Sequence, residues 1–478
     1  MRRRVLATHL RGWIDPAVAF SALAGAQSAA FWLDSGIGAA AGWSYIGSSE
    51  RVVTATIDEN SVTEQPSGRR REGSILDFLR EELDGGIEPE PAAGPFQLGW
   101  VGWLGYELHA QTMSTGLRRA SGHPDAALMF VDRAIAFDHA ARRVTLIAIG
   151  DEWTADLQSW RASVEHALSR RLPLSSPLVH GSGRSAPAHS DEDRAQKAES
   201  GAPEVEWAYT DAEYLSMIGS CQKAIAGGDA YQLCLTTEAR VTAHPDPVDS
   251  YLALRALSPT RNGGFVRIGE VSLLSSSPEQ FLTVAPDGLL ESKPIKGTRR
   301  RGASTEEDAA LRRELVESEK ERAENLMIVD LMRNDLGRVS EVGSVGVVDL
   351  LTVESYAQVH QLVSTVQGRL AGELSPVDAV AACFPAGSMT GAPKHSAVLI
   401  LDGLERRARG IYSGAFGYFG LDGRIDLAMV IRSIVLDTQG ATIGTGGGIT
   451  ALSVPEEELD EVKLKAAALL SVLGAVIW

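Results

Sequence analysis

A lysine in a short, bent segment is the first residue in this 478-residue chain whose surroundings suggest chemistry. Lys296 lies between Pro294 and Gly297, which mark an irregular backbone, and three arginines follow within five residues. A lysine near other cations loses its proton more easily, and a neutral amine is a nucleophile or a base. Taken alone, however, such a segment is more often a basic surface loop with a solvated lysine. A catalytic role for Lys296 therefore depends on the rest of the sequence.

Two pairs of glutamates with helical spacing suggest a metal site. Glu321 and Glu324 lie in a helix predicted for 317–336, and Glu458 and Glu461 lie in the last predicted helix of the chain. Residues three positions apart share one helix face, so each helix presents two carboxylates in one direction. No histidine or cysteine accompanies them, and an all-oxygen ligand set suits Mg²⁺. Solvated helix faces are the alternative, and a metal site requires the two helices to converge.

A run of three glycines suggests an anion site. Gly446, Gly447 and Gly448 follow a predicted strand, and glycines allow backbone N–H groups to approach an anion without obstruction by side chains. Arg432 and Lys465 are basic residues that would complement a carboxylate. A flexible turn is the alternative interpretation of the three glycines.

The overall composition limits the classes of partner and compartment. The chain has a net charge of −17, which argues against nucleic acid or an anionic membrane as its main partner. Cys221, Cys234 and Cys383 are far apart and form no CxxC motif, which favours buried thiols in a reducing compartment. No run of about 18 apolar residues is present, so no membrane span is expected. These features predict a soluble, cytoplasmic protein.

The elements that must position these residues fall into three stretches. Residues 1–171 mix short apolar strands with glycine-rich turns, and within them 98–107 places glycines among aromatic residues, which indicates close backbone packing. Residues 172–206 are rich in Pro, Ser, Gly and charged residues and predict a mobile loop or linker. Residues 207–478 combine many strands with helices, one of them starting at a capping box on Ser304. Without steady βαβ alternation, the pattern predicts an α+β fold.

Taken together, the motifs resemble the chorismate-utilising enzymes. The resemblance covers about 207–475 and is specific, while the N-terminal part resembles the amino-group-transferring members more weakly, through 31–34 and 99–107. The matching stretches are Ser277-Pro278-Glu279, 294–299, 321–331, 333–338, 362–364, 385–394, 431–433, 446–461 and Lys465. The resemblance implies one large anthranilate synthase component I-like fold with two β-sheets packed face to face and helices outside. In such a fold, 172–206 is a loop within one intertwined domain rather than a boundary between two.

Three single positions distinguish branches of this family. Pro-Ile-Lys-Gly-Thr is the mark of the aminodeoxychorismate synthase component I branch, whereas anthranilate synthase component I has alanine in place of Lys296. Gln232 stands where isochorismate and salicylate synthases have a lysine base. Gln361 stands where anthranilate synthase has a histidine. These residues favour amination of chorismate with pyruvate retained.

The resemblance also implies roles for individual residues. Mg²⁺ is expected on Glu324 and Glu461, with Glu321 and Glu458 supporting it through water. Glu279 is expected to act as general acid on the C4 hydroxyl, and Lys296 to attack C2 before ammonia attacks C4. The residues expected to contact chorismate are Gln232, Thr298, Tyr412, Arg432, Gly446, Gly447, Gly448 and Lys465.

Ammonia is expected from a separate glutaminase subunit, because no Gly-x-Cys-x-Gly nucleophile turn is present and none of the three cysteines has such a context. Anthranilate synthase component I is the alternative function, and a non-catalytic subunit that binds chorismate or tryptophan and regulates a glutaminase is a minor one. Para-aminobenzoate for folate and a specialised metabolite are both compatible with the predicted product.

Overall fold

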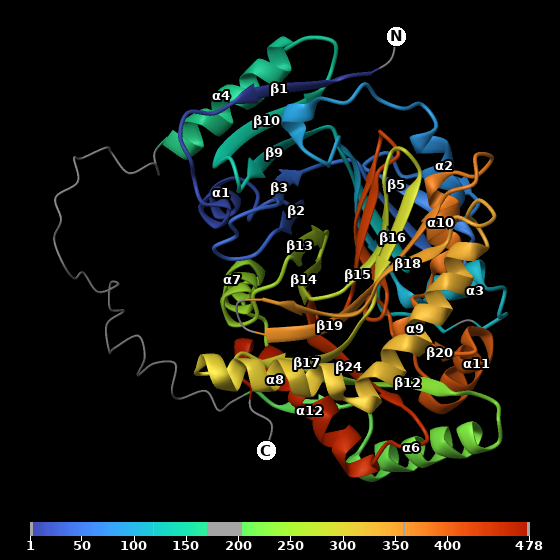
Figure 1. Ribbon diagram of the computed structural model, residues 1–478. Coiled ribbons are helices and arrows are strands. Elements are labelled where there is room, and N and C mark those ends of the chain that lie inside the picture. The colour runs from blue at the N-terminus through green and yellow to red at the C-terminus, as the bar shows by residue number, and fades with distance from the viewer. Residues whose placement is uncertain (1–2, 118, 170–202, 357–358, 476–478) are drawn as a thin grey trace.

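The computed structural model describes residues 3–117, 119–169, 203–356 and 359–475. In these residues the strands form two 12-stranded sheets that lie face to face, with helices on their outer sides (Figure 1). Neighbouring strands pair antiparallel. For example, Leu235 in β12 (Gln232–Val241) pairs with Gly447 in β24 (Gly440–Ile449). The predicted α+β fold with two packed sheets is confirmed.

The first sheet is built from both ends of the chain. Its strands are β1 (Val5–His9), β2 (Ala29–Asp34), β3 (Trp43–Ser48), β9 (Arg133–Asp138), β10 (Arg143–Ile149), β11 (Val205–Trp207), β12 (Gln232–Val241), β13 (Asn262–Ile268), β14 (Val271–Ser277), β20 (Gly391–Ala392), β23 (Ser433–Asp437) and β24 (Gly440–Ile449). They run in the order β1-β10-β9-β3-β2-β13-β14-β23-β24-β12-β11, and β20 also pairs with β12.

The second sheet has the same mixed origin. Its strands are β4 (Val52–Thr56), β5 (Ser61–Gln65), β6 (Arg69–Glu72), β7 (Gly99–Leu104), β8 (Ala126–Val131), β15 (Gln280–Val284), β16 (Leu289–Lys293), β17 (Ile295–Arg300), β18 (Gly346–Ser355), β19 (Val359–Arg369), β21 (Ala415–Gly420) and β22 (Ile425–Met429). Their order is β17-β19-β16-β15-β22-β21-β7-β8-β4-β5-β6, and β18 also pairs with β19.

Helices cover the outer face of each sheet. They are α1 (Pro16–Leu23), α2 (Ile75–Leu83), α3 (His109–Thr112), α4 (Ala155–Ser169), α6 (Asp211–Ala226), α7 (Pro247–Leu257), α8 (Thr305–Glu317), α9 (Glu319–Gly337), α10 (Pro376–Cys383), α11 (Lys394–Glu405) and α12 (Pro455–Val472), with the 3-10 turns η1 (Pro91–Ala93), η2 (Tyr106–Leu108) and η3 (Gly387–Met389). No helix in the described ranges is long and apolar enough to cross a membrane.

Three apolar layers hold this arrangement together. Helices α1, α4, α7 and α12 bury side chains such as Phe20 and Leu469 on the outer face of the first sheet. Helices α2, α9 and α10 do the same on the second sheet, with Leu79 and Met332. Between the sheets, aromatic residues such as Phe31 form the third layer. Alternate residues of a strand point to opposite faces, so each sheet supplies both the inner layer and one outer layer.

Strands from either side of the 172–206 segment are direct neighbours in both sheets. β2 pairs with β13 in the first sheet, and β7 pairs with β21 in the second. The residues before and after this segment therefore share one set of sheets and cores. Of the predicted mobile loop, 172–202 lies outside the described residues. The prediction is wrong at its end, where Val205–Trp207 forms β11 and pairs with β12 because its backbone completes the edge of the first sheet.

The main helix predictions near the candidate site are confirmed, with one local difference. α9 and α12 lie where the glutamate pairs require helices, and Val462 and Ala466 of α12 are buried as expected. Ser304 caps α8 by accepting the N–H of Glu307. The return half of the predicted capping box is missing, because the Glu307 carboxylate accepts instead from the Ala303 N–H.

The glycines of β7 permit close contact between strands. A Cβ atom on Gly102 would lie 2.0 Å from the carbonyl oxygen of Ala127 in β8. Trp100 and Trp103, on either side of Gly102, are buried at 0% and 1% exposure. The predicted packing role of this aromatic and glycine segment is confirmed.

We expect Gly102→Ala to lower the free energy of unfolding by about 3 kcal/mol or more, because the clash is with backbone that cannot rotate away. The midpoint of urea denaturation measures this change. Gly219→Ala in α6 is the matched control, since a Cβ there meets nothing within 4 Å. Alanine in an open helix position should stabilise by about 0.5–1 kcal/mol. Equal midpoints for the two variants would contradict the close approach of β7 and β8.

Candidate active site

Lys296, on β17, acts on three carboxyl groups: Glu279 is buried, Glu324 is half-buried and Glu461 is exposed. Its charge lowers the pKa of Glu279, Glu324 and Glu461, although burial is the largest influence on all three and acts in the opposite direction. The lysine is partly buried and makes no hydrogen bond or ion pair with any residue that the structure describes. One amine thus faces carboxyl groups that come from three separate elements, and it is not engaged elsewhere.

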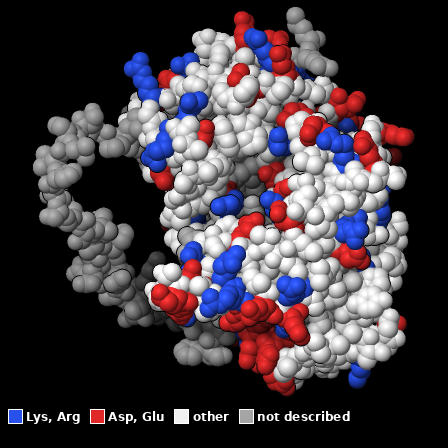
Figure 2. Space-filling model, viewed as in Figure 1, with Lys and Arg blue, Asp and Glu red and all other residues white. Residues whose placement is uncertain are grey.

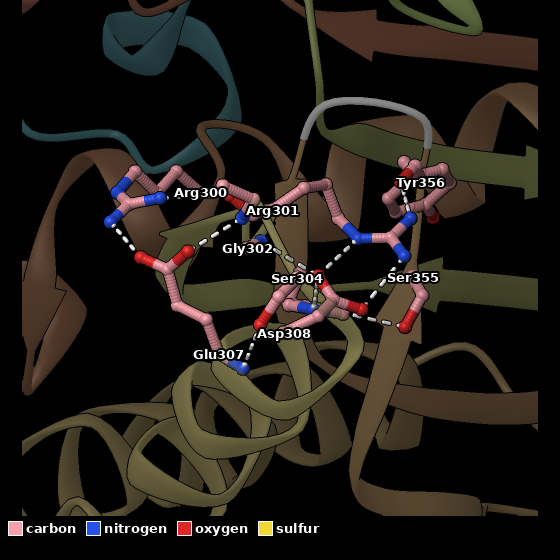
Figure 3. A network of polar contacts seen from close by, with 10 residues as sticks. Arg300, Arg301, Gly302, Ser304, Glu307, Asp308, Ser355 and Tyr356 are labelled. Atoms are coloured by element: carbon pink, nitrogen blue, oxygen red, sulfur yellow. Dashed lines mark hydrogen bonds and ion pairs between the residues drawn. The ribbon is translucent and has the colours of Figure 1, made fainter.

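The three arginines after Lys296 pair with carboxylates of helices, and Figure 3 shows this for Arg300 and Arg301. The first bonds to carboxylates of α8 and α9. Arg300 pairs with Glu307, and Arg301 makes two hydrogen bonds of 2.8 Å to Asp308. Figure 2 shows basic and acidic side chains close together over the region where α8 lies in Figure 1. The arginines therefore have acidic partners of their own, and the expectation that they act chiefly on Lys296 is wrong.

The same network attaches the start of α8 to the lysine strand. Asp308 also accepts the Gly302 N–H at 2.8 Å and lies 3.0 Å from Nε2 of His360, which is buried in β19. The other ring nitrogen of His360 lies 2.8 Å from the Ser355 hydroxyl in β18. Because Asp308 joins the end of β17 to β19 and α8, the strand that carries the lysine is held at its exposed end.

Glu279 lies at the turn between β14 and β15 and is 8% exposed. Its backbone is fixed by β22, where the Met429 N–H donates to the Glu279 carbonyl at 3.0 Å. Burial raises the pKa of its carboxyl group, while Lys296 and the Ser388 hydroxyl lower it. The net effect is a raised pKa, which keeps a carboxyl group protonated to higher pH. Such a group can donate a proton.

Helix α9 presents Glu324 from a rigid position. The next residue, Asn325, is fully buried, and its side chain bonds to the Leu362 carbonyl and the Ser364 hydroxyl in β19. Burial raises the pKa of Glu324, and the charges of Glu321 and Glu458 add to this effect. Among the described residues, Glu324 has no hydrogen-bond partner.

Helices α9 and α12 converge, as a metal site between them requires. Nζ of Lys320 in α9 lies 3.3 Å from Oε1 of Glu458 in α12, and Glu458 is 3% exposed. Ser453 donates a second hydrogen bond to this carboxylate at 2.7 Å. Glu461, one turn further, pairs with Lys465 at 2.7 Å.

The four predicted metal ligands do not form a closed cluster with these side-chain positions. Glu321 bonds to an arginine, and Glu458 and Glu461 bond to lysines. In the part of the chain that the structure describes, no group of three or more His, Cys, Asp or Glu side chains is close enough to hold a metal. Carboxylates that lie near one another repel, and basic side chains close by offset that repulsion.

The three glycines belong to the strand itself and do not follow it, so the alternative interpretation of a flexible turn is wrong. Gly446, Gly447 and Gly448 belong to β24 and pair with β12. A Cβ on Gly446 would lie 2.5 Å from the Leu235 carbonyl oxygen, and one on Gly447 would lie 3.1 Å from Glu458. The register of β23 with β24 ends at Thr442, so this stretch has a partner strand on one edge only. Alternate amides on the other edge are free of strand partners.

Gln232 lies beside this glycine strand. Its side chain is 1% exposed, and a Cβ on Gly448 would lie 2.4 Å from its Nε2. Its Oε1 has no hydrogen-bond partner among the described residues. An unpaired buried acceptor costs free energy unless a bound molecule satisfies it. Gln232 is therefore placed to accept a hydrogen bond from a ligand.

Tyr412 and Arg432, two of the predicted substrate contacts, are close enough for their charges to interact. Burial lowers the pKa of the Arg432 guanidinium, and the charge of Tyr412 acts in the opposite direction. The Arg432 side chain is exposed to solvent. The Tyr412 ring lies against Gly444, where a Cβ would be 2.0 Å from its Cγ.

Two of the predicted substrate contacts, Lys465 and Thr298, have surroundings that suggest other roles: Lys465 bonds to the protein backbone, and Thr298 is exposed. Lys465 donates a hydrogen bond to the Gly446 carbonyl at 2.9 Å, so it braces the glycine strand. Thr298 is exposed on β17 and pairs with Gln361 of β19. Thr298 thus lies at the exposed end of its strand, whereas the charge of Lys296 on the same strand reaches Glu279, Glu324 and Glu461.

Sequence reasoning missed a buried ionic group behind the site. Arg409 is 3% exposed and makes two hydrogen bonds of 2.7 and 2.8 Å to Glu405. Glu107, from the N-terminal third, accepts the backbone N–H groups of Arg409 and Gly410. Burial raises the pKa of Glu107 to about 7. The run of charged residues at 405–409 was a signal, but nothing in it indicated a buried partner some 300 positions away.

Comparisons with known proteins agree with this geometry. Residues 28–471 match the family model described as chorismate binding enzyme. The chain is 43% identical over 99% of its length to an aminodeoxychorismate synthase of Streptomyces griseus, and it spans 64% of the length of that protein. It is 34% identical over 96% of its length to anthranilate synthase component 1 of Streptomyces coelicolor, of which it spans 86%.

The fold has a counterpart among solved structures. Anthranilate synthase component I from Streptococcus pneumoniae superposes with a TM-score of 0.73 and 26% identity, and the match covers 96% of this chain and 97% of that one. The family match over 28–471 includes every strand of both sheets except β1, and the parts of the chain that carry Glu279, Glu324 and Glu461. The chain belongs to the chorismate binding enzyme family.

Proposed function

We propose that the chain is the aminodeoxychorismate synthase component I type of this family and converts chorismate and ammonia to 4-amino-4-deoxychorismate. The observation that carries the proposal is the position of Lys296, an unengaged amine whose charge acts on the carboxyl groups of the buried Glu279, the half-buried Glu324 and the more exposed Glu461. Greater identity to a protein named aminodeoxychorismate synthase than to one named anthranilate synthase supports it, as do the neutral side chains of Gln232 and Gln361.

The first step uses Lys296 and Glu279. The amine of Lys296 forms a bond to C2 of chorismate, the ring double bond shifts, and the C4–oxygen bond breaks. Glu279 gives its proton to the departing hydroxyl, which leaves as water. The raised pKa of Glu279 fits this role, because a carboxyl group with a raised pKa keeps its proton to higher pH.

The second step releases the lysine. Ammonia forms a bond to C4, the double bond shifts back, and the bond between C2 and Lys296 breaks so that the amine is regenerated. The ammonium group at C4 loses one proton, which restores the acid form of Glu279. Two substitutions replace one difficult substitution, and pyruvate stays on the product.

Chorismate carries two carboxylates, and two groups of residues suit them. The open amides of β24 and the neighbouring Lys465 suit the ring carboxylate. Arg432 and Tyr412 suit the enolpyruvyl carboxylate. A separate glutaminase subunit is proposed as the ammonia source, for para-aminobenzoate or a related product, in the cytoplasm.

The residues present fit Mg²⁺ as a cofactor. All candidate ligands are oxygen atoms, α9 and α12 converge, and Glu324 is a carboxylate whose hydrogen-bonding capacity is unused among the described residues. Glu324 and Glu461 would hold the ion, with Glu321 and Glu458 around it. When bound, the ion supplies positive charge to the ring carboxylate. Lys320 and Lys465 now pair with Glu458 and Glu461, and these ion pairs would have to open for the glutamates to bind the ion.

We expect Lys296→Ala to reduce aminodeoxychorismate formation below about 1% of the wild-type rate, because the nucleophile is lost. Product is identified by mass in an assay with purified protein, chorismate, Mg²⁺ and ammonium, and anthranilate is measured in parallel by fluorescence. Any residual turnover should shift toward anthranilate.

Lys293→Ala is the control, since that lysine pairs with Glu291 on β16 and has no role in the proposed steps. It should retain full activity. Unchanged turnover in Lys296→Ala would remove the nucleophile role, and anthranilate as the wild-type product would favour the alternative function.

The raised pKa of Glu279 predicts a pH dependence. If the protonated form is the acid, kcat falls as pH rises through this pKa and is retained below it. Glu279→Gln cannot donate a proton, so kcat should fall by about 100-fold or more and the alkaline limb of the pH profile should disappear. An alkaline limb that survives in Glu279→Gln would assign it to another group.

We expect Glu324→Gln to weaken Mg²⁺ binding by about ten-fold or more, because a neutral amide is a much poorer ligand than a carboxylate. Calorimetric titration with Mg²⁺ alone, and again with chorismate present, measures the effect. Glu319→Gln, at the exposed start of α9, is the matched control and should bind Mg²⁺ as the wild type does. Equal affinity in the two variants would exclude Glu324 as a ligand.

A further inference from the structure

A buried glutamate of the N-terminal third holds the segment that leads to Tyr412. Glu107 is 2% exposed, and its two carboxylate oxygens accept the Arg409 N–H at 2.7 Å and the Gly410 N–H at 2.9 Å. Tyr106, beside it, lies under the Arg409 guanidinium at 4.3 Å. None of the chemical steps proposed above uses this carboxylate.

The side chain of Arg409 continues the connection into two other segments. Nη1 donates to the Met389 carbonyl at 2.7 Å, and Nη2 donates to the Cys234 carbonyl at 2.9 Å. Glu405 neutralises the guanidinium and also accepts the Thr236 N–H at 2.9 Å. The buried arginine is therefore fully committed to fixed partners, and any change in its backbone moves all of them.

Each of these segments carries a residue of the proposed site. Met389 follows Ser388, whose hydroxyl lies against Glu279. Cys234 is two residues along β12 from Gln232, so their side chains share one face of the strand. Tyr412 follows Gly410 by two residues, and its ring has no free space beside Gly444.

We propose that Glu107 and Arg409 form a positioning clamp, which sets the distance between Tyr412, Gln232 and Ser388 and thereby the shape of the chorismate pocket. This inference rests on the proposed function. The clamp explains why the N-terminal third contributes to the site although none of the proposed catalytic residues lies in it. Neither residue touches the reacting atoms, so their effect is on substrate binding and orientation. A misplacement of about 1 Å in such contacts costs up to about 100-fold in rate.

The test is Glu107→Gln in the full chain, compared with Asp125→Asn. Glutamine keeps the shape but has one acceptor oxygen, so its NH₂ group opposes one of the two backbone N–H groups. Asp125 is a buried carboxylate nearby that accepts the Ile57 N–H at 2.7 Å and bonds to no residue of 405–414. Chorismate Kd from tryptophan fluorescence, KM for chorismate and for ammonium, kcat and the folded fraction are measured for each protein.

We expect Glu107→Gln to raise the Kd and KM for chorismate by about ten-fold and to leave KM for ammonium unchanged. Asp125→Asn should lose stability with chorismate Kd and KM unchanged. If Glu107→Gln does not fold, Glu107→Asp, which keeps the charge and shortens the reach, replaces it with the same expected result.

A fall in kcat that only follows the folded fraction, with chorismate Kd and KM at wild-type values, would overturn the clamp and leave Glu107 a purely structural residue. The proposed function fails separately. A wild-type protein that binds chorismate but forms no aminodeoxychorismate would refute it, while the comparison of chorismate Kd values would still decide whether the clamp shapes the pocket.

Discussion

The concentration of carboxyl groups around one amine is the constraint on which the rest of this structure depends. Glu279, Glu324 and Glu458 are shielded from water, and burying charged carboxylates is costly unless basic groups lie close by. Lys320 and Lys465 bond to carboxylates on α12, while Lys296 influences its neighbours without bonding to them. The arrangement is stable only if each element holds its side chain at a fixed place.

Both sheets and their helices provide that rigidity. α9 is anchored to β19 through Asn325, α12 is anchored to β24 through the hydroxyl of Thr445, and β17 is held at its end by Asp308. The strands from the N-terminal third complete these sheets and bring Glu107 to the segment before Tyr412. A site assembled from so many elements needs the whole double sheet, which explains why the two halves of the chain are interleaved.

The predictions that succeeded concern local patterns and motifs. Helical spacing placed both glutamate pairs on helices, and the absence of βαβ alternation indicated α+β. The interpretation of Gly446–Gly448 as a turn failed, because the need for glycine there comes from Leu235 and Glu458 across the strand rather than from local backbone flexibility. The expected effect of the arginines on Lys296 was also wrong, because Arg300 and Arg301 pair instead with carboxylates at the start of α8, seven residues along the chain.

By itself, the sequence determined the types of group available for chemistry: one lysine in a tight segment, five acidic residues, three glycines and a neutral glutamine. It also determined the helices that carry the two glutamate pairs, because spacing along a helix is a local property. Only the tertiary structure decided that Lys296 faces three carboxyl groups and not three arginines. It alone placed Glu107 against Arg409, 302 positions away. Such contacts depend on the register of strands far apart in the chain, and no local pattern encodes that register.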